Sequence, residues 1–175
     1  MRNLDTIIDF GSKNLRLGVF DQSSEIIYSS NVNIIGNFEN DNFEKSLNKL
    51  IRDAEKKLST HLVDINVLYD SAKFNFIDLS IKKSFDRPTL ISKYCKILVE
   101  EANFIVSESN FKDQILHITI NNMIVDNNRT LEILSDDIKA KSLILELKFL
   151  CLQKSLINNL SNKFKENNLN ILNIY

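Results

Sequence analysis

A short segment near the N-terminus contains the residue types that bind phosphate groups. It spans residues 7–18, with the sequence IIDFGSKNLRLG, and it holds two of the three glycines of the 175-residue chain. The N–H groups of a tight turn, together with a hydroxyl, can form a concavity that binds an anion. A single carboxylate can hold a hydrated Mg²⁺, and an arginine can donate charge-assisted hydrogen bonds to a phosphate. The candidate binding residues are Asp9, Gly11, Ser12, Lys13, Asn14 and Arg16, with Asp9 as the candidate for water-mediated magnesium.

The same letters are also compatible with an ordinary β-hairpin turn. In that interpretation Gly11 supplies a positive φ angle, which glycine adopts without a steric penalty, and the polar side chains are simply solvated. A string of the form Asp-x-Gly-Ser is common, so the four letters alone favour the ordinary turn. The choice between the two interpretations depends on the elements around the segment.

Hydrophobic periodicity predicts these elements. Apolar side chains at i, i+4, i+7, i+8, i+11 and i+15 from Phe43 to Leu58 predict an amphipathic helix. Asp41 and Glu44 resemble a capping box at its start. The pattern further predicts strands at residues 6–10, 15–20 and 25–35 before this helix, and at 62–69 after it. The candidate segment therefore joins the first two strands of a three-stranded meander.

A second unit is expected to begin near Asp70. The apolar parity changes between Phe76 and Ile77, which predicts a bulge or twist, and Pro88 stands before a helical stretch. The expected elements are a strand at 74–85, a helix lined by residues 91–105, strands at 116–120 and 142–151, a closing helix at 156–164 and a strand at 169–175. Both units mix helix and sheet, so the predicted fold class is α/β, of the α+β kind.

Composition narrows the function classes. A formal net charge of −1, from 22 basic and 23 acidic residues, argues against a nucleic-acid-binding protein, which carries a basic face. Cys95 and Cys151 form neither a disulfide framework nor a zinc motif, and they lie on apolar faces where free cysteine commonly packs. No apolar run approaches the roughly 18 residues of a membrane span. We therefore expect a soluble globular chain of a reducing compartment.

Other polar residues are predicted to have ordinary roles. His61 and His117 have no acidic or cysteine neighbours at metal-ligand spacing, so we expect them at the surface or at a strand edge. Asp136 and Asp137 are adjacent, whereas paired catalytic carboxylates converge from separate elements. A solvated turn is the expected place for these two residues.

The hairpin of Asp9–Ser12, followed by a third strand, a helix and a strand, resembles the first phosphate loop of the actin-like ATPase superfamily. In that superfamily this loop contacts the β- and γ-phosphates of bound ATP, and the position of Arg16 matches a basic residue in several members. The resemblance implies ATP and Mg²⁺ as cofactors of the full-length family. It also implies a partial core of the actin-like, ribonuclease H-like type, with the six candidate residues on the phosphate side.

The second unit is similar to an insert found in one branch of that superfamily. Residues 72–153 resemble, in order, length and position, the strand-helix-strand-strand (SHS2) insert of the FtsA family of bacterial cell-division proteins. The stretch 42–58 is similar to the helix ahead of the insert. The resemblance implies three parts: residues 1–70 as the first part of the core, 71–167 as the SHS2 subdomain and 168–175 as the strand that returns to the core.

Membership of the FtsA family implies a scaffold on the cytoplasmic face of the bacterial inner membrane. Such proteins link FtsZ filaments to that membrane and bind ATP with slow turnover. The implied partners are FtsZ, further FtsA-like subunits and other divisome proteins, contacted in part through the SHS2 insert, and no nucleic acid. Membrane attachment uses a C-terminal helix that nothing in these residues resembles. We therefore expect this chain alone neither to hydrolyse ATP nor to bind membranes.

Two features differ from the family pattern. The stretch 135–140 contains neither the proline nor the glycine of the family's turn before the third SHS2 strand. The chain also stops before the second phosphate loop, the adenosine loop and the second core domain. It is therefore expected to be the N-terminal portion of a longer protein, or a naturally short relative that has lost ATP binding.

Three other functions remain open. PilM, the actin-like adaptor of type IV pilus machinery, shares the fold and the insert, and sequence features barely separate it from FtsA. A freestanding interaction module with a decayed phosphate hairpin is a second alternative. A small-molecule kinase of the same superfamily, such as a sugar or acetate kinase, is a third, but it needs a catalytic acid that this sequence does not place.

Overall fold

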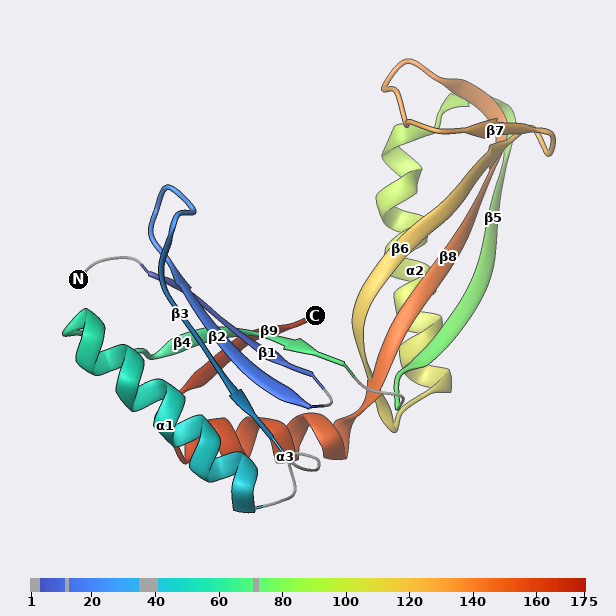
Figure 1. Cartoon of the computed structure of the whole chain (residues 1–175). Helices are drawn as coiled ribbons and strands as arrows, with labels where there is room; N and C mark the ends of the chain where they lie inside the picture. The colour runs from blue at the N-terminus through green and yellow to red at the C-terminus, as the bar shows by residue number, and fades with distance from the viewer. Residues whose placement is uncertain (1–3, 12, 35–40, 71–72) are drawn as a thin grey trace. The chain divides into compact units, whose positions relative to one another are not determined.

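The computed structural model describes residues 4–11, 13–34, 41–70 and 73–175 (Figure 1). These residues form two compact units. Unit 1 comprises Met1–Ala72 and Ser155–Tyr175, and unit 2 comprises Lys73–Lys154. The first unit is thus built from two separate stretches of the chain, with the second unit inserted between them.

Unit 1 contains a mixed five-stranded sheet in the order β3-β2-β1-β4-β9. The first three strands form an antiparallel meander, whereas β4 is parallel to β1 and β9 is parallel to β4. The parallel pairs need crossover connections, and these carry the helices. The strands are β1 (Asp5–Phe10), β2 (Asn14–Phe20), β3 (Ile26–Asn33), β4 (Asp64–Tyr69) and β9 (Asn170–Ile174).

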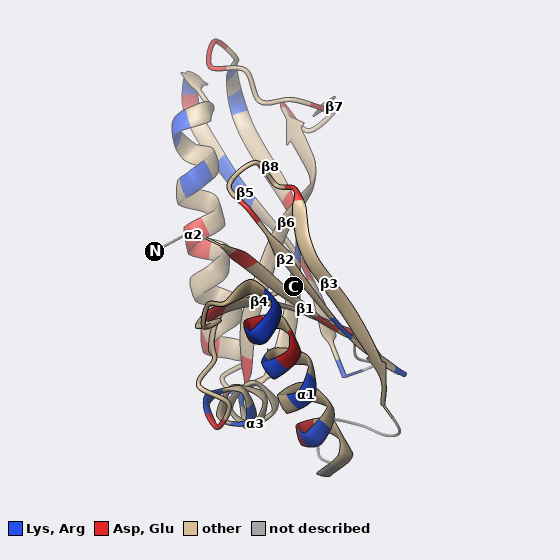
Figure 2. Ribbon diagram, turned by 60° about the vertical axis from the view of Figure 1, so that its left-hand side comes forward, with Lys and Arg blue, Asp and Glu red and all other residues tan. Residues whose placement is uncertain are grey.

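Two amphipathic helices, α1 (Asp41–Leu58) and α3 (Lys154–Lys165), cover one face of this sheet (Figure 1). Phe43 of α1 lies 4.8 Å from Phe10 of β1 and 6.3 Å from Phe164 of α3, measured between ring centroids. All three rings are at most 4% exposed. In Figure 2 the ribbon of α1 is coloured blue and red at several places along its length, which marks its basic and acidic residues. The apolar period in the sequence therefore determines which side of the helix is buried.

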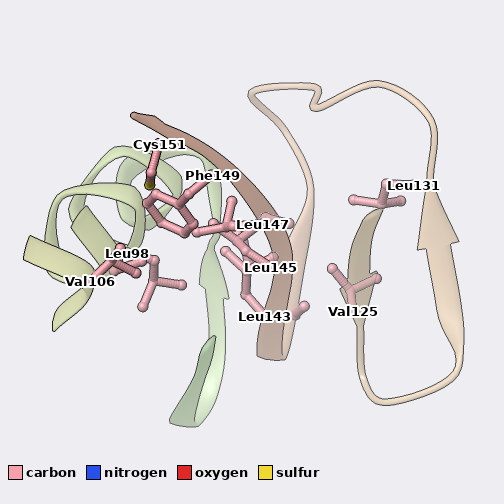
Figure 3. Packing of buried hydrophobic residues seen from close by; sticks show 12 residues of the cluster. Leu98, Val106, Val125, Leu131, Leu143, Leu145, Leu147, Phe149 and Cys151 are labelled. Carbon is pink, nitrogen blue, oxygen red and sulfur yellow. The ribbon is translucent and has the colours of Figure 1, made fainter. Parts of the chain in front are cut away.

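Unit 2 contains an antiparallel four-stranded sheet in the order β5-β8-β6-β7, with one long helix, α2 (Ser92–Ser109). Leu98, Ala102 and Val106 of α2 follow the i, i+4, i+8 spacing, and they pack against alternate residues of β8 (Figure 3). The strands are β5 (Asn75–Leu90), β6 (Asp113–Val125), β7 (Arg129–Leu131) and β8 (Lys139–Gln153). One face of this sheet thus carries the core of unit 2.

The bulge predicted at Phe76 and Ile77 is wrong. Pairing between β5 and β8 is continuous from Asn75 to Ser84, and the register shifts only between Ser84 and Thr89. Ile77 faces the core, whereas Phe76 lies on the other face and is 63% exposed. Pro88 lies within the irregular stretch, where a residue without an N–H is tolerated in a strand. The strand therefore continues past the proline, and α2 begins at Ser92.

The division into units differs from the predicted boundaries at one point. The sequence predicted a subdomain of residues 71–167, but the compact unit ends at Lys154 and α3 belongs to unit 1. The physical reason is the apolar face of α3, whose buried Phe164 contacts Phe43. Residues 71 and 72 lie outside the described part of the chain.

Candidate functional site

Asp9 and Arg16 meet on the sheet of unit 1. The two residues are direct partners in the antiparallel β1–β2 pair, so their side chains point to the same face. Arg16 Nη1 donates a hydrogen bond to Asp9 Oδ2 at 3.0 Å, and the side chains are 60% and 31% exposed. This face is opposite to the one that carries Phe10 and the two helices. The pair is therefore accessible to a ligand.

This ion pair lines a cavity of about 580 Å³. Gly18 lies in its lining and is paired with Ile7 on one side and Ser29 on the other. A Cβ at position 18 would lie 3.1 Å from the ring of Phe20, so the missing side chain keeps the middle of the strand open. The lining consists of Ile7, Asp9, Arg16, Leu17, Gly18, Phe20, Ser29, Ser30, Asn31 and Leu68.

The turn between β1 and β2 places the remaining candidates. The N–H of Gly11 donates to the carbonyl of Asn14 at 3.1 Å, so this N–H is used within the hairpin rather than offered to an anion. Gly11 does not adopt a positive φ, which corrects the ordinary-turn expectation. Lys13 is exposed, and its carbonyl accepts the N–H of Ile34 at 2.9 Å. Ser12 lies outside the described residues, so the predicted anion concavity stays a prediction.

Several lining residues were missed by sequence reasoning. Ser29, Ser30 and Asn31 of β3 come to the cavity because β3 pairs with β2 opposite Gly18 and Arg16. Two signals were present in the sequence. One was a glycine in the middle of an apolar strand, and the other was a polar run within a predicted strand. Neither signal says which strands are neighbours.

The described residues bring no group of three or more histidine, cysteine or acidic side chains together as a metal site. Asp9 is the acidic residue in the cavity lining, and its Oδ2 already accepts a hydrogen bond from Arg16. Direct coordination of Mg²⁺ by this oxygen does not fit, because the guanidinium occupies that side. Oδ1 would hold such an ion only indirectly, by accepting a hydrogen bond from one of its water ligands.

His61 and the two cysteines have surroundings that fit a structural role. His61 is exposed, and its Nδ1 lies 3.2 Å from Glu55 Oε1, which also accepts the N–H of Leu62. Burial raises the pKa of the Cys95 thiol. For Cys151, burial and the nearby Asp113 carboxylate both raise the pKa. Both thiols are thus disfavoured as nucleophiles, because the reactive form is the thiolate.

The structure places Asp136 and Asp137 in a solvated turn, as predicted. Asp136 and Asp137 are exposed, and the Ser135 hydroxyl donates to Asp137 Oδ1. This hydrogen bond lowers the pKa of Asp137. His117 lies in β6 and is half-buried.

No protein-family model and no curated protein matches this sequence. Among solved structures, the chain is similar to a protein of the PilM–PilN type IV pilus biogenesis complex, with a TM-score of 0.59 and 9% sequence identity. The match covers 99% of this chain, so it includes both units, but only 47% of that chain. Among the described residues, no helix is long and apolar enough to cross a membrane. The likeness shows a shared fold, which agrees with the predicted actin-like type.

Proposed function

We propose that this chain is part of an actin-like adaptor that assembles with a protein partner, in the manner of the matched pilus complex. One observation carries the proposal: the likeness spans nearly the whole chain, including the inserted unit 2. The matched structure is named as a complex of PilM with PilN. A PilN-like protein is therefore the first partner to test, and unit 2 serves as the SHS2-type insert in this proposal.

The cell-division function rests on the sequence resemblance alone. It predicts FtsZ and other FtsA-like subunits as partners and a place at the cytoplasmic face of the inner membrane. Both proposals share a scaffold that binds proteins, so the identity of the partner separates them.

Co-purification distinguishes these partners. The tagged full chain is incubated with the PilN-like protein and, separately, with FtsZ from the same genome, and complexes are detected by size-exclusion chromatography with light scattering. We expect a complex with the PilN-like protein and none with FtsZ. A complex with FtsZ alone would establish the cell-division function instead. Binding to neither protein would favour a freestanding module with a different partner.

The cavity around Asp9 and Arg16 is proposed as the phosphate end of a nucleotide site. Arg16 is 60% exposed and offers guanidinium donors besides the Nη1–H that binds Asp9. In this proposal Asp9 orients Arg16 and would hold Mg²⁺ through a water molecule. A bound Mg²⁺ would offset part of the negative charge of the phosphates. Gly18 leaves room for the ligand beside the strand. The proposed role of the nucleotide is to control assembly, not to drive a metabolic reaction.

Thermal unfolding tests this site, because a ligand that binds only the folded state stabilises it. The gain is about 0.4 kcal/mol when the Mg-ATP concentration equals Kd, which raises Tm by about 1 °C in a chain of this size. We expect R16Q to abolish the rise, and R52Q, an exposed arginine of α1, to retain it. An equal rise in R16Q and the wild type would place the nucleotide elsewhere. No rise in the wild type would favour a site that has lost ATP.

A further inference from the structure

A second cavity lies wholly within unit 2, at one end of its sheet. Its volume is about 470 Å³. Its lining includes Lys82 of β5, Lys139 and Lys141 of β8, and Asp126, which directly follows β6. These strands are neighbours in the order β5-β8-β6, so side chains distant in sequence converge there. Three ammonium groups against one carboxylate give the lining a net positive charge.

The carboxylate of Asp126 has a local structural role. Asp126 Oδ1 accepts the N–H groups of Lys141 at 2.8 Å and of Ser142 at 3.2 Å, and the Asp126 N–H donates to the Ser142 carbonyl at 3.2 Å. These bonds tie the β6–β7 turn to the first residues of β8. The carboxylate is thus engaged with backbone donors and forms no ion pair with the lysines in the described part of the chain.

The three lysines have ammonium N–H groups that make no hydrogen bond to any described residue. Lys82 Nζ donates one hydrogen bond, to Asn127 Oδ1 at 2.8 Å, which holds it over the same turn. An ammonium has three protons, so two remain. Lys139 and Lys141 are exposed and make no ion pair with any described residue. Like charges gathered at one place repel one another, and a bound anion would relieve that repulsion.

An unpartnered hydroxyl is an independent observation at the same place. Ser142 lines the cavity and is only 6% exposed, and its Oγ is enclosed with no hydrogen-bond partner among the described residues. Leaving a buried hydroxyl unpaired costs free energy, and such groups commonly have a partner that is not part of the chain. Because Ser142 belongs to the cavity lining, an anion bound there is a candidate partner for this hydroxyl.

We propose that this cavity binds a phosphate group, free or carried by a small metabolite, through Lys82, Lys139, Lys141 and the Ser142 hydroxyl. A tetrahedral oxyanion has acceptors for several donors at once, which matches three ammonium groups and one hydroxyl. The site lies outside the Asp9 cavity and does not depend on the function proposed above.

Titration of the ¹⁵N-labelled full chain at constant ionic strength, with inorganic phosphate and with glycerol 3-phosphate, tests this site. We expect saturable shifts confined to the amides of residues 82–84, 126–127 and 139–142. The double variant K139Q/K141Q should weaken binding at least about tenfold, because two charge-assisted donors are lost. K93Q, an exposed lysine at the start of α2, is the matched control and should bind as the wild type does. Tighter binding of glycerol 3-phosphate would identify an ester as the ligand, and equal binding would identify the free ion.

Ser142 provides the second variant. S142A keeps all three lysines and removes only the hydroxyl, so phosphate affinity should fall several-fold while Tm without phosphate stays equal or rises. Unchanged affinity in S142A would overturn the role of the hydroxyl. Shifts that spread over many surface lysines, or that persist in K139Q/K141Q, would mean an adventitious ion only and would overturn the site.

Discussion

Gly18 leaves the centre of β2 without a side chain, beside the Asp9–Arg16 pair. A Cβ there would meet the Phe20 ring at 3.1 Å, whereas a Cβ at Gly11 would meet only a backbone oxygen at an ordinary 3.6 Å. Neither glycine adopts a positive φ. A side chain at position 18 would therefore displace a neighbour, whereas a small side chain at position 11 would fit.

We predict that G18V loses the Mg-ATP-induced rise in Tm, because its side chain fills the cavity. The free energy of unfolding should fall by about 1 kcal/mol, since the valine also displaces the Phe20 ring. G11A should keep both the Tm rise and the stability of the wild type. Thermal scans with and without Mg-ATP measure both effects. A full nucleotide response in G18V would show that the ligand does not enter this cavity.

The buried thiol of Cys151 predicts a pH dependence. Its pKa is raised above the ordinary 9.0 by burial and by Asp113, so unfolded chains lose this proton first as pH rises. The stabilising contribution is complete below about pH 9 and is lost as pH rises through the folded-state pKa. The free energy of unfolding should then fall with a slope of up to about 1.4 kcal/mol per pH unit. Urea denaturation from pH 7 to 10.5 measures this slope, which should be smaller in C151A. Identical slopes would contradict this assignment.

At the scale of elements, a buried carboxylate fixes the start of β6 to its neighbours. Asp113 is 9% exposed, and its Oδ2 accepts hydrogen bonds from Asn75 at 2.7 Å and from Asn110 at 3.0 Å. Asn75 begins β5 and Asn110 caps the end of α2. Three elements of unit 2 therefore meet at one side chain.

We predict that N110A destabilises unit 2 by about 1–3 kcal/mol, because the buried carboxylate loses one of its two amide donors. The matched control is N122A, which removes an exposed bond to Glu146 and should cost less than about 1 kcal/mol. Urea denaturation followed by circular dichroism provides the comparison. Equal losses in the two variants would mean that the Asp113 cluster contributes no more than a surface hydrogen bond.

Most elements were predictable from local pattern, but their limits and neighbours were not. The i, i+4 spacing of apolar residues located α1, and alternation located the core face of β8. The sequence did not show that β5 continues past Pro88, because an irregular end of a strand has no period. It also did not predict β7, which is only three residues long.

At the scale of the whole molecule, unit 1 depends on both of its stretches. β9 pairs with β4, and Phe164 of α3 is fully buried near Phe43 of α1. Without residues 155–175 the sheet would lose an edge strand, and α1 would lose part of its apolar contact. Unit 2 is continuous in sequence and has its own apolar cluster.

We therefore predict that a fragment of residues 73–154 folds by itself, whereas a fragment of residues 1–72 does not. Dispersed amide signals and a cooperative urea transition should appear only for the first fragment. Adding residues 155–175 in trans to the second fragment should restore part of its structure, since both stretches contribute to one core. A folded 1–72 fragment would show that α3 and β9 are dispensable.

The sequence by itself determined the types and order of the elements other than the short β7, the apolar face of each helix and the segment that carries Asp9 and Arg16. These depend on local spacing, because the periods of helix and strand are properties of the backbone. Only the tertiary structure decided that Asp9 faces Arg16, that β3 brings Ser29 to Gly18 and that α3 completes unit 1. Strand neighbours and registers are determined by contacts between residues far apart in the chain, which no local window contains.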